Sequence, residues 1–380
     1  MSLFLLTFFL LYGALHFYLL VKAKQAFSPG MAFTIVLILF MLLMITAPLI
    51  VYFSEKHGFI SWARFLAFVG YCWMGFVFLC FCCLIAVDLC RLFIFAGGLL
   101  FPGPWAALVP SPKYYFPLSV LLSLAVALFG YSEAQSIRTE RIVVSSPKIP
   151  REAGRVRIVQ ISDVHLGMIV RHARLSGIIR EVKKAGPDLL ISTGDLVDGQ
   201  INNLAGLAEI LREITPRYGK FAITGNHEFY AGLAQSLDFA RRAGFTILRG
   251  EGLTVAGLIN LAGVDDPAGK GFGLYRAVSE KELLANLPQE KFTILLKHRP
   301  EVENAALGFF DLQISGHTHK GQIFPFRLLT RIFYPYYGGS FPLPPYAFLH
   351  VSRGSGTWGP PIRFLTPPEV TVYELFHEDK

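Results

Sequence analysis

The stretch Ile158-Val159-Gln160-Ile161-Ser162-Asp163-Val164-His165-Leu166-Gly167 decides how the rest of this 380-residue chain is interpreted. It is an apolar run that ends abruptly in Asp163, His165 and a glycine. Such a run predicts a buried β-strand that delivers a carboxylate and an imidazole at its carboxyl end. An Asp-x-His pair is a weak signal by itself, because it occurs by chance in many loops. Its meaning therefore depends on whether other strands supply partners.

Composition divides the chain into two parts. Hydrophobic residues make up 53% and charged residues 16% of the sequence, which is too apolar for an ordinary soluble protein. Residues 1–133 hold six of the 35 Lys and Arg, three of the 27 Asp and Glu, and all five cysteines. The remainder therefore has soluble composition, no disulfide framework and no thiolate metal site. The net charge of +8 includes no dense basic tract, which argues against nucleic acid as a stable partner.

Residues 1–133 are predicted to form a multi-pass transmembrane bundle in the cell membrane, since roughly 20 apolar residues cross a bilayer as a helix. About four helices are expected, over residues 3–21, 31–53, 62–87 and 114–131. Residues 93–101 are too short to cross alone and are expected to be re-entrant or interfacial. Asp88 and Arg91 are interpreted as a helix-end pair, with an intramembrane functional pair as the alternative. Lys and Arg in short loops, five against four, favour a cytoplasmic C-terminal domain.

Residues 134–155 are predicted to be a polar linker, and residues 156–380 a domain in which strands and helices alternate. This alternation predicts an α/β fold with helices on both sides. Five predicted strands end in residues that can bind a metal ion: Asp163 with His165, Asp195, Asn226 with His227, His298, and His317 with His319. Because the carboxyl ends of strands in an open α/β sheet meet at one crevice, we expect these side chains to converge.

The donor types indicate the kind of metal site. Two carboxylates, one amide oxygen and at least four imidazoles suit Mn, Fe, Zn or Co better than Ca or Mg. They are too many for one ion, so two ions about 3.5–4 Å apart and bridged by a carboxylate are expected. Gly194, Gly225 and Gly316 each precede a candidate ligand, where the chain is expected to turn sharply and let backbone approach the ions.

With these motifs in place, residues 156 to about 375 resemble the calcineurin-like metallophosphoesterases, specifically the membrane-attached bacterial branch described as YkuE-like or YaeI-like. The resemblance rests on Asp163-Val164-His165, Gly194-Asp195, Gly225-Asn226-His227-Glu228, the His298 strand and Gly316-His317-Thr318-His319, and residues 351–361 are also similar. It implies an α-β-β-α sandwich of two mixed sheets, following the N-terminal transmembrane α-helical bundle. One residue departs from the branch: Lys320 stands where Gly is expected, and would contact a substrate phosphate or be solvated.

The resemblance also implies a role for each residue. Asp163, His165 and His319 would hold the first ion, Asn226, His298 and His317 the second, and Asp195 would bridge them. His227 would face the substrate as general acid or as a cation that stabilises the transition state. The implied enzyme is a membrane-anchored, metal-dependent phosphoric ester hydrolase. It would cleave a phosphodiester, phosphomonoester or pyrophosphate bond by attack of a metal-bridging hydroxide, with manganese expected first and iron, zinc or cobalt as alternatives.

Alternatives to this function stay open. Some relatives act on UDP-diacylglucosamine, so a lipid pyrophosphatase is one of them. The aromatic, proline-rich residues 324–348 would rim the pocket or rest on the bilayer, which suits a lipid-linked substrate, or are an ordinary connection packed on the sheet. A non-catalytic metal-binding regulatory module is disfavoured by the complete ligand set, and a transporter by the few charges within the spans. The following residues are predicted to be structural or exposed: His16, His57, His172, His350, His377, Glu228 and Glu369.

Overall fold

The computed structural model describes residues 3–199, 204 and 206–379. The chain divides into two compact units, which are described separately. The helical unit comprises Met1–Tyr131 with Gly359–Ile362, and the α/β unit comprises Ser132–Trp358 with Arg363–Lys380.

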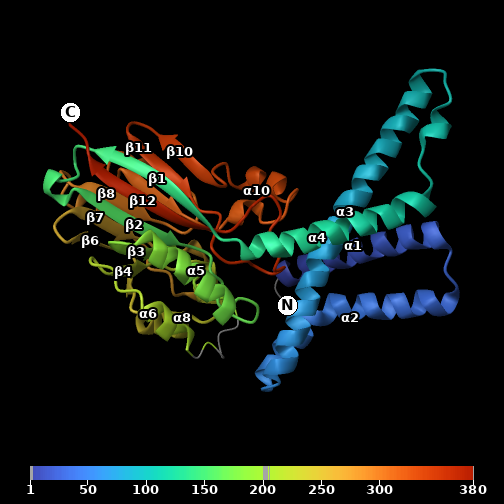
Figure 1. Ribbon diagram of the computed structural model, residues 1–380, viewed down its shortest axis with the longest axis horizontal. Coiled ribbons are helices and arrows are strands. Elements are labelled where there is room, and N and C mark those ends of the chain that lie inside the picture. The colour runs from blue at the N-terminus through green and yellow to red at the C-terminus, as the bar shows by residue number, and fades with distance from the viewer. Residues whose placement is uncertain (1–2, 200–203, 205, 380) are drawn as a thin grey trace. The chain divides into compact units, whose positions relative to one another are not determined.

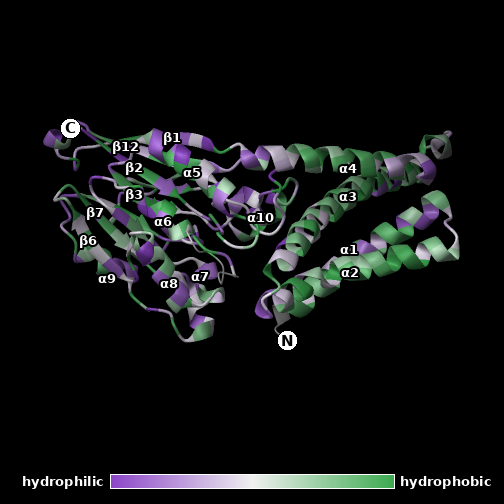
Figure 2. Cartoon of the chain, turned by 60° about the horizontal axis from the view of Figure 1, so that its bottom comes forward, coloured by the Kyte–Doolittle hydropathy of each residue, from purple (hydrophilic) through white to green (hydrophobic). Residues whose placement is uncertain are grey.

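The helical unit contains the four long N-terminal helices that the sequence predicts. They are α1 (Leu3–Phe27), α2 (Met31–Lys56), α3 (Ile60–Leu100) and α4 (Pro112–Gln135). Each is long and apolar enough to cross a membrane, and Figure 2 shows hydrophobic residues along their lengths. Leu10 (64%), Met31 (81%) and Phe93 (73%) stay exposed, as expected of helices whose outer surface meets lipid rather than water.

The third helix is longer than the predicted span over residues 62–87. It continues through Asp88 and Arg91 to Leu100, so residues 93–100 belong to the same helix and are not a separate re-entrant segment. The reason is that the charges are paired and so do not end the helix. The Asp88 carboxylate accepts hydrogen bonds from the Tyr18 hydroxyl (2.7 Å) and the Lys22 ammonium (2.6 Å), and lies 3.5 Å from the Arg91 guanidinium one turn along.

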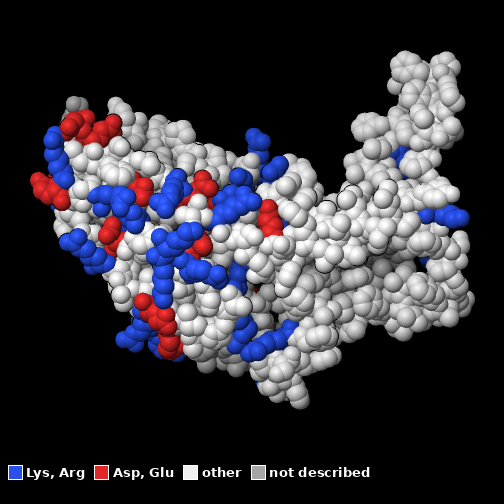
Figure 3. Space-filling view, in the orientation of Figure 1, with Lys and Arg blue, Asp and Glu red and all other residues white. Residues whose placement is uncertain are grey.

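The α/β unit contains two six-stranded mixed sheets (Figure 1). The first sheet has the order β1 (Arg138–Ser146), β12 (Glu369–His377), β2 (Arg155–Ile161), β3 (Leu189–Ser192), β4 (Lys220–Ala222) and β5 (Thr246–Ile247). The second has the order β10 (Gly339–Leu343), β11 (Ala347–Val351), β9 (Leu312–Ser315), β8 (Phe292–Leu296), β7 (Ile259–Gly263) and β6 (Glu251–Val255). The helices of this unit are α5 (His172–Ala185), α6 (Leu207–Arg212), α7 (Asn226–Tyr230), α8 (Leu233–Arg242), α9 (Glu280–Ala285) and α10 (Arg327–Phe333). On the face drawn in Figure 3, charged side chains gather on this unit and are sparse on the helical unit.

Strand β1 lies where the sequence predicts a linker over residues 134–155. It pairs in parallel with β12, from Arg138 opposite Glu369 to Ser146 opposite His377. As the edge strand of its sheet it keeps much of its length exposed, including Val143 at 65%. Its polar composition therefore resembles that of a linker, and the α/β unit begins before residue 156.

The alternation of side chains along the strands produces four layers. In β2, Val159 and Ile161 pack with α5, α6 and α8 on one side of the first sheet. Ile158 points the other way and packs against the second sheet, together with Ile294 and Ile314. The far side of the second sheet packs against α9, where Leu295 and Leu349 meet Leu284. The layers are helices, sheet, sheet and helices, which confirms the predicted α-β-β-α sandwich.

We expect Lys220→Met to destabilise the α/β unit. Lys220 is 7% exposed, and its ammonium donates to the carbonyl oxygens of Leu211 (2.9 Å) and Ala243 (2.5 Å) at the carboxyl ends of α6 and α8. Each hydrogen bond to a charged group contributes about 1.5–3 kcal/mol, and carbonyl groups at helix ends would lose their partner. Thermal unfolding of the full chain in detergent would show a lower midpoint. Lys184→Met, whose side chain is 77% exposed, should leave the midpoint in place, and equal midpoints for the two variants would contradict the prediction.

Candidate metal centre

The eight side chains singled out in the sequence come together at the carboxyl ends of five strands. Asp163 and His165 follow β2, Asp195 follows β3, Asn226 and His227 begin α7 after β4, His298 follows β8, and His317 and His319 follow β9. Seven of them are at most 9% exposed, and His317 is half-buried. Since β2, β3 and β4 belong to one sheet and β8 and β9 to the other, the site lies where the ends of both sheets meet.

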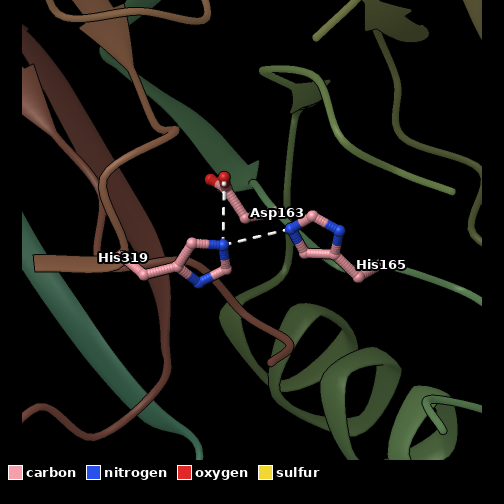
Figure 4. A group of neighbouring side chains, drawn as sticks. All are labelled: Asp163, His165 and His319. Atoms are coloured by element: carbon pink, nitrogen blue, oxygen red, sulfur yellow. Dashed lines mark hydrogen bonds and ion pairs between the residues drawn. The ribbon is translucent and has the colours of Figure 1, made fainter. Parts of the chain in front are cut away.

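Asp163, His165 and His319 form the first group of donor atoms (Figure 4). The Nε2 atoms of His165 and His319 are 3.0 Å apart, and the His319 Nε2 is 3.5 Å from a carboxylate oxygen of Asp163. The three side chains thus direct two nitrogens and one oxygen toward a common point.

The second group is centred on His298. Its Nε2 lies 3.2 Å from the Asp195 Oδ2, 3.2 Å from the Asn226 Oδ1 and 3.2 Å from the His317 Nδ1. The same Asp195 Oδ2 is 3.7 Å from the His165 Nε2 of the first group. The Asp195 carboxylate therefore lies between the two groups.

Hydrogen bonds at the outer ring nitrogens orient two of these imidazoles. The Nδ1 of His298 donates to the Thr193 carbonyl oxygen (2.7 Å), which leaves its Nε2 directed to the donor group. The Nε2 of His317 lies 2.8 Å from the Tyr334 hydroxyl, which leaves its Nδ1 directed there. Partners of this kind select the ring orientation and the tautomer of histidines that bind metals.

The backbone turns sharply at the ends of these strands. Five of the eight residues have left-handed φ angles: Asp163 (51°), His165 (54°), Asp195 (50°), His317 (71°) and His319 (47°). Non-glycine residues rarely adopt this region, and it is concentrated at functional sites. The three glycines that precede candidate ligands act differently from one another. Gly194 is itself left-handed, at φ 92°, whereas a Cβ on Gly225 would collide with the Asp195 carboxylate, and one on Gly316 with the side chains of Ser162 and Asp163.

Burial and mutual charge shift the acid–base behaviour of the donors. Burial raises the pKa of Asp163 to about 6 and, with the nearby His227, lowers the pKa of His165 to about 4. Burial also holds the pKa values of His317 and His319 well below the ordinary histidine value. In contrast, burial alone would lower the pKa of His298, but the negative charge of the Asp195 carboxylate outweighs this effect and raises the pKa to about 10.

The donor set fits a divalent cation. Imidazole nitrogens and carboxylate oxygens converge in two groups, and this mixture of donors is the ligand chemistry of Mn, Fe, Zn and Co sites. A cation would also take over the positive charge that the His298 proton supplies beside Asp195, because a metal-binding imidazole must give up that proton.

Three further residues contact the site without having been identified from the sequence. Asp198 lies 2.9 Å from the Nδ1 of His227, and together with Asp195 it outweighs burial and raises the pKa of His227 to about 9. Its signal in the sequence is a second aspartate three positions after Asp195. Tyr334 contacts His317, and the buried Arg363 lies 3.0 Å from the His319 Nδ1 and donates to the carbonyl oxygens of Arg353 (2.7 Å) and Gly356 (2.5 Å). Neither of these two lies next to a ligand in the sequence, so no local pattern marks them.

Two residues near the candidate ligands, Glu228 and Lys320, contact mainly other parts of the protein chain. The Glu228 carboxylate accepts hydrogen bonds from the backbone N–H groups of Asp195 (2.9 Å), Leu196 (2.9 Å) and Gly225 (2.6 Å), and so holds two ligand-bearing turns together. Lys320 has a left-handed φ of 51°, the conformation that glycine adopts most easily. Its methylene groups lie against Gly338, within 3.0 Å of where a Cβ would stand.

Comparison with known proteins agrees with this arrangement. Residues 156–321 match the family described as calcineurin-like phosphoesterase. An uncharacterized metallophosphoesterase of Aquifex aeolicus is 42% identical, covering 66% of this chain and 97% of that protein. YkuE of Bacillus subtilis, also an uncharacterized metallophosphoesterase, is 32% identical, covering 64% and 87%. A transmembrane protein with a metallophosphoesterase domain from Danio rerio is 29% identical, covering 67% and 61%.

The fold and the donor groups define a metal-dependent phosphoric ester hydrolase. The chain belongs to the calcineurin-like metallophosphoesterase family, as the motifs in its sequence indicate. Enzymes of this family use divalent metal ions, and the Asp and His groups described above are able to bind them.

We expect Tyr334→Phe to weaken metal binding. The change removes the hydroxyl next to the His317 Nε2 and leaves the ring that packs 5.2 Å from the imidazole. Loss of a partner outside the first shell of ligands lowers metal affinity by about 10- to 100-fold. Titration of apo-protein with Mn²⁺ would measure this directly. Tyr336→Phe, which alters a neighbouring tyrosine that packs on Phe341, is the matched control, and equal affinities in the two variants would exclude the role given to Tyr334.

Proposed function

We propose that this protein is a membrane-anchored phosphoesterase with two metal ions, and that it hydrolyses a phosphodiester, phosphomonoester or pyrophosphate bond. The position of the Asp195 carboxylate between two groups of nitrogen and oxygen donors supports this proposal, because a carboxylate in that position would be able to contact both ions. Asp163, His165 and His319 would hold one ion, and Asn226, His298 and His317 the other. Manganese is the metal expected first, with iron, zinc or cobalt as alternatives.

When bound, the two ions would activate a water molecule as nucleophile and polarise the phosphoryl oxygens. The residues of the chain then have distinct tasks. Asp195 and Asp163 keep the charge of the site negative enough to attract cations, and both are held by backbone N–H groups, of His227 (2.8 Å) and His317 (2.9 Å) respectively. The sequence supplies no cysteine nucleophile in this unit, because all five cysteines lie in the helical unit.

His227 is the proposed general acid or transition-state cation. Its ring stands 4.6 Å from the His165 ring, and its Nδ1 is held by Asp198, so its Nε2 is the nitrogen available to a substrate. The neighbouring carboxylates favour its protonated form, which can give a proton to the leaving oxygen or stabilise negative charge on the phosphoryl group.

The helical unit would serve as a multi-pass anchor in the cell membrane, with residues 1–133 as the transmembrane region. Support comes from the length and apolar character of all four helices. The α/β unit would then face the cytoplasm, which the distribution of Lys and Arg in short loops favours.

Asp195→Asn should remove metal and activity together. The change keeps the size of the side chain but withdraws the charge that both ions would share. Metal content by mass spectrometry should fall, and the rate of hydrolysis of bis(p-nitrophenyl) phosphate with Mn²⁺ should decrease at least about 100-fold. Loss of a residue that only hydrogen-bonds to a metal ligand already lowers activity by up to about 100-fold. Full activity with unchanged metal content would contradict the bridging role.

His227→Ala should separate catalysis from metal binding. We expect metal content to stay at the wild-type level while kcat falls about 10²- to 10⁴-fold, the usual contribution of general acid catalysis. Asp198→Asn should cause a smaller loss in the same direction, because it leaves His227 in place without its charged partner. His172→Ala, an exposed histidine at the start of α5, is the matched control and should keep wild-type kcat. Full turnover in His227→Ala would show that its assigned role is wrong.

A further inference from the structure

Helix α10 carries an apolar outer surface in the α/β unit. Five large hydrophobic side chains on the helix and at its N-cap are between 47% and 76% exposed: Phe326 (47%), Leu328 (57%), Leu329 (50%), Ile332 (73%) and Phe333 (76%). We call these five residues the α10 surface. A helix of a soluble domain normally turns such side chains toward the core, and contiguous exposed apolar residues mark a site of interaction.

One side of α10 packs against the α/β unit. The buried Thr330 hydroxyl donates to the Phe326 carbonyl oxygen (3.3 Å), and the Arg327 guanidinium stacks 4.8 Å from the Phe324 ring. Gly321 lets the helix approach closely, since a Cβ there would stand 2.5 Å from the Arg327 backbone nitrogen. The apolar residues therefore face outward because the helix is packed by its other side.

The helix is also tied to the metal centre at its carboxyl end. Tyr334, the residue that ends α10, places its hydroxyl 2.8 Å from the His317 Nε2. Three residues further on, the Tyr337 carbonyl oxygen accepts a hydrogen bond from the Thr318 hydroxyl (2.8 Å). The C-terminal end of α10 and the residues after it are thus connected by hydrogen bonds to the candidate ligand His317 and to Thr318, which lies between His317 and His319 in the chain.

The charge of this part of the chain is positive. Residues 312–368 contain no Asp or Glu, but they contain five basic residues: Lys320, Arg327, Arg331, Arg353 and Arg363. Two of these, Arg327 and the exposed Arg331, belong to α10 itself. Aromatic and aliphatic side chains together with Arg on a short helix are the composition of segments that lie in the interface of anionic membranes.

Only a short connection joins the last apolar helix to the first strand of the α/β unit. Helix α4 is long and apolar enough to span a membrane and ends at Gln135, and strand β1 begins at Arg138. The two intervening residues reach at most about 7 Å when extended. A unit tethered so closely meets lipid at a high effective concentration, whereas a soluble protein partner would have to be recruited from solution.

Half-exposed aromatic rings also stand at the proposed general acid. The Tyr230 ring lies 5.4 Å and the Trp358 ring 6.1 Å from the His227 ring, and the Phe272 ring is tilted against the Tyr230 ring at 6.1 Å. Each of these three side chains is about half exposed. A substrate that approaches His227 therefore passes apolar groups, which suits a molecule with an apolar part next to its phosphoryl group.

We propose that the α10 surface lies in the interfacial layer of the bilayer, with Arg327 and Arg331 at the level of anionic headgroups, and that the site acts on phosphoester groups of membrane lipids. The proposed membrane contact is based on the exposed apolar residues of α10. The proposed substrate class rests in addition on the proposed function. The occupant of the α10 surface is lipid, not a second copy of the chain.

The contact can be tested with a photoreactive benzoylphenylalanine in place of Phe333. The full chain would be reconstituted in nanodiscs of phosphatidylethanolamine and phosphatidylglycerol, irradiated, and analysed by intact-protein mass spectrometry. We expect adducts with the mass of one lipid. The same group in place of Tyr218, which precedes β4 and so lies at the end of the sheet opposite to the site, should give none. Cross-linked dimers of the chain, no adduct at Phe333, or equal lipid adducts at both positions would overturn the membrane contact.

The substrate class can be tested with matched long-chain and short-chain versions of three lipids: phosphatidic acid, phosphatidylglycerol and cytidine diphosphate diacylglycerol. These offer a monoester, a diester and a pyrophosphate. We expect at least one long-chain lipid to be cleaved in nanodiscs. The ratio of long-chain to short-chain turnover should fall at least tenfold in Ile332→Glu/Phe333→Glu and stay constant in Tyr218→Glu.

The outcomes separate this inference from the proposed function. An unchanged ratio in Ile332→Glu/Phe333→Glu would overturn the role of the α10 surface. Wild-type cleavage of bis(p-nitrophenyl) phosphate without cleavage of any of the three lipids would overturn the lipid substrate class and leave the phosphoesterase standing. Failure on every substrate with metal bound would instead overturn the proposed function.

Discussion

The candidate metal centre depends on the left-handed turns that the chain makes after three of its strands, β2, β3 and β9. Asp163, His165, Asp195, His317 and His319 all have positive φ angles. Such conformations cost on the order of 1–3 kcal/mol each for non-glycine residues, so they persist only where the surroundings fix them. The surroundings here are the buried strands β2, β3 and β9, and backbone hydrogen bonds between the turns, such as that from the His165 N–H to the Asp195 carbonyl oxygen (3.0 Å). Packing within the α-β-β-α architecture thus offsets the conformational free energy of these turns.

The turns bring together groups that would not otherwise be buried side by side. Two carboxylates and five imidazoles share a nearly inaccessible space, and burying an unpaired charge is costly. Contacts within the protein offset part of the free-energy cost of burying these charges. Backbone N–H groups donate to both aspartates, Glu228 holds the turns around Asp195, and the Asp195 carboxylate raises the pKa of His298, whose Nε2 lies 3.2 Å away. The remaining donors are imidazole nitrogens and carboxylate oxygens, which suit a divalent cation, so the chemistry of the site agrees with that of the family.

The predictions from sequence succeeded where a feature is local in the chain. An apolar run followed by a ligand residue marks both the strand and the point where it ends, so the fold class and the convergence of eight side chains followed from five short motifs. Strand β1 was missed because an edge strand has little buried surface to show in its sequence. The length of α3 was missed because the partners that neutralise Asp88 come from α1, distant in sequence. Tyr334 and Arg363 were missed for the same reason, since their contacts with His317 and His319 exist only once the chain is folded.

The segment from His317 to Tyr334 joins two properties that are usually carried by separate parts of an enzyme. It contains two of the candidate metal ligands and, eight residues after the second of them, the exposed apolar helix α10. Because the Tyr334 hydroxyl lies 2.8 Å from the His317 Nε2, a hydrogen bond links the end of α10 directly to a candidate ligand. The role of a helix linked in this way requires no conformational change. It sets the distance and orientation between the donor groups and whatever surface covers its apolar residues, and for a substrate held in that surface this distance decides whether the phosphoryl group reaches the donors.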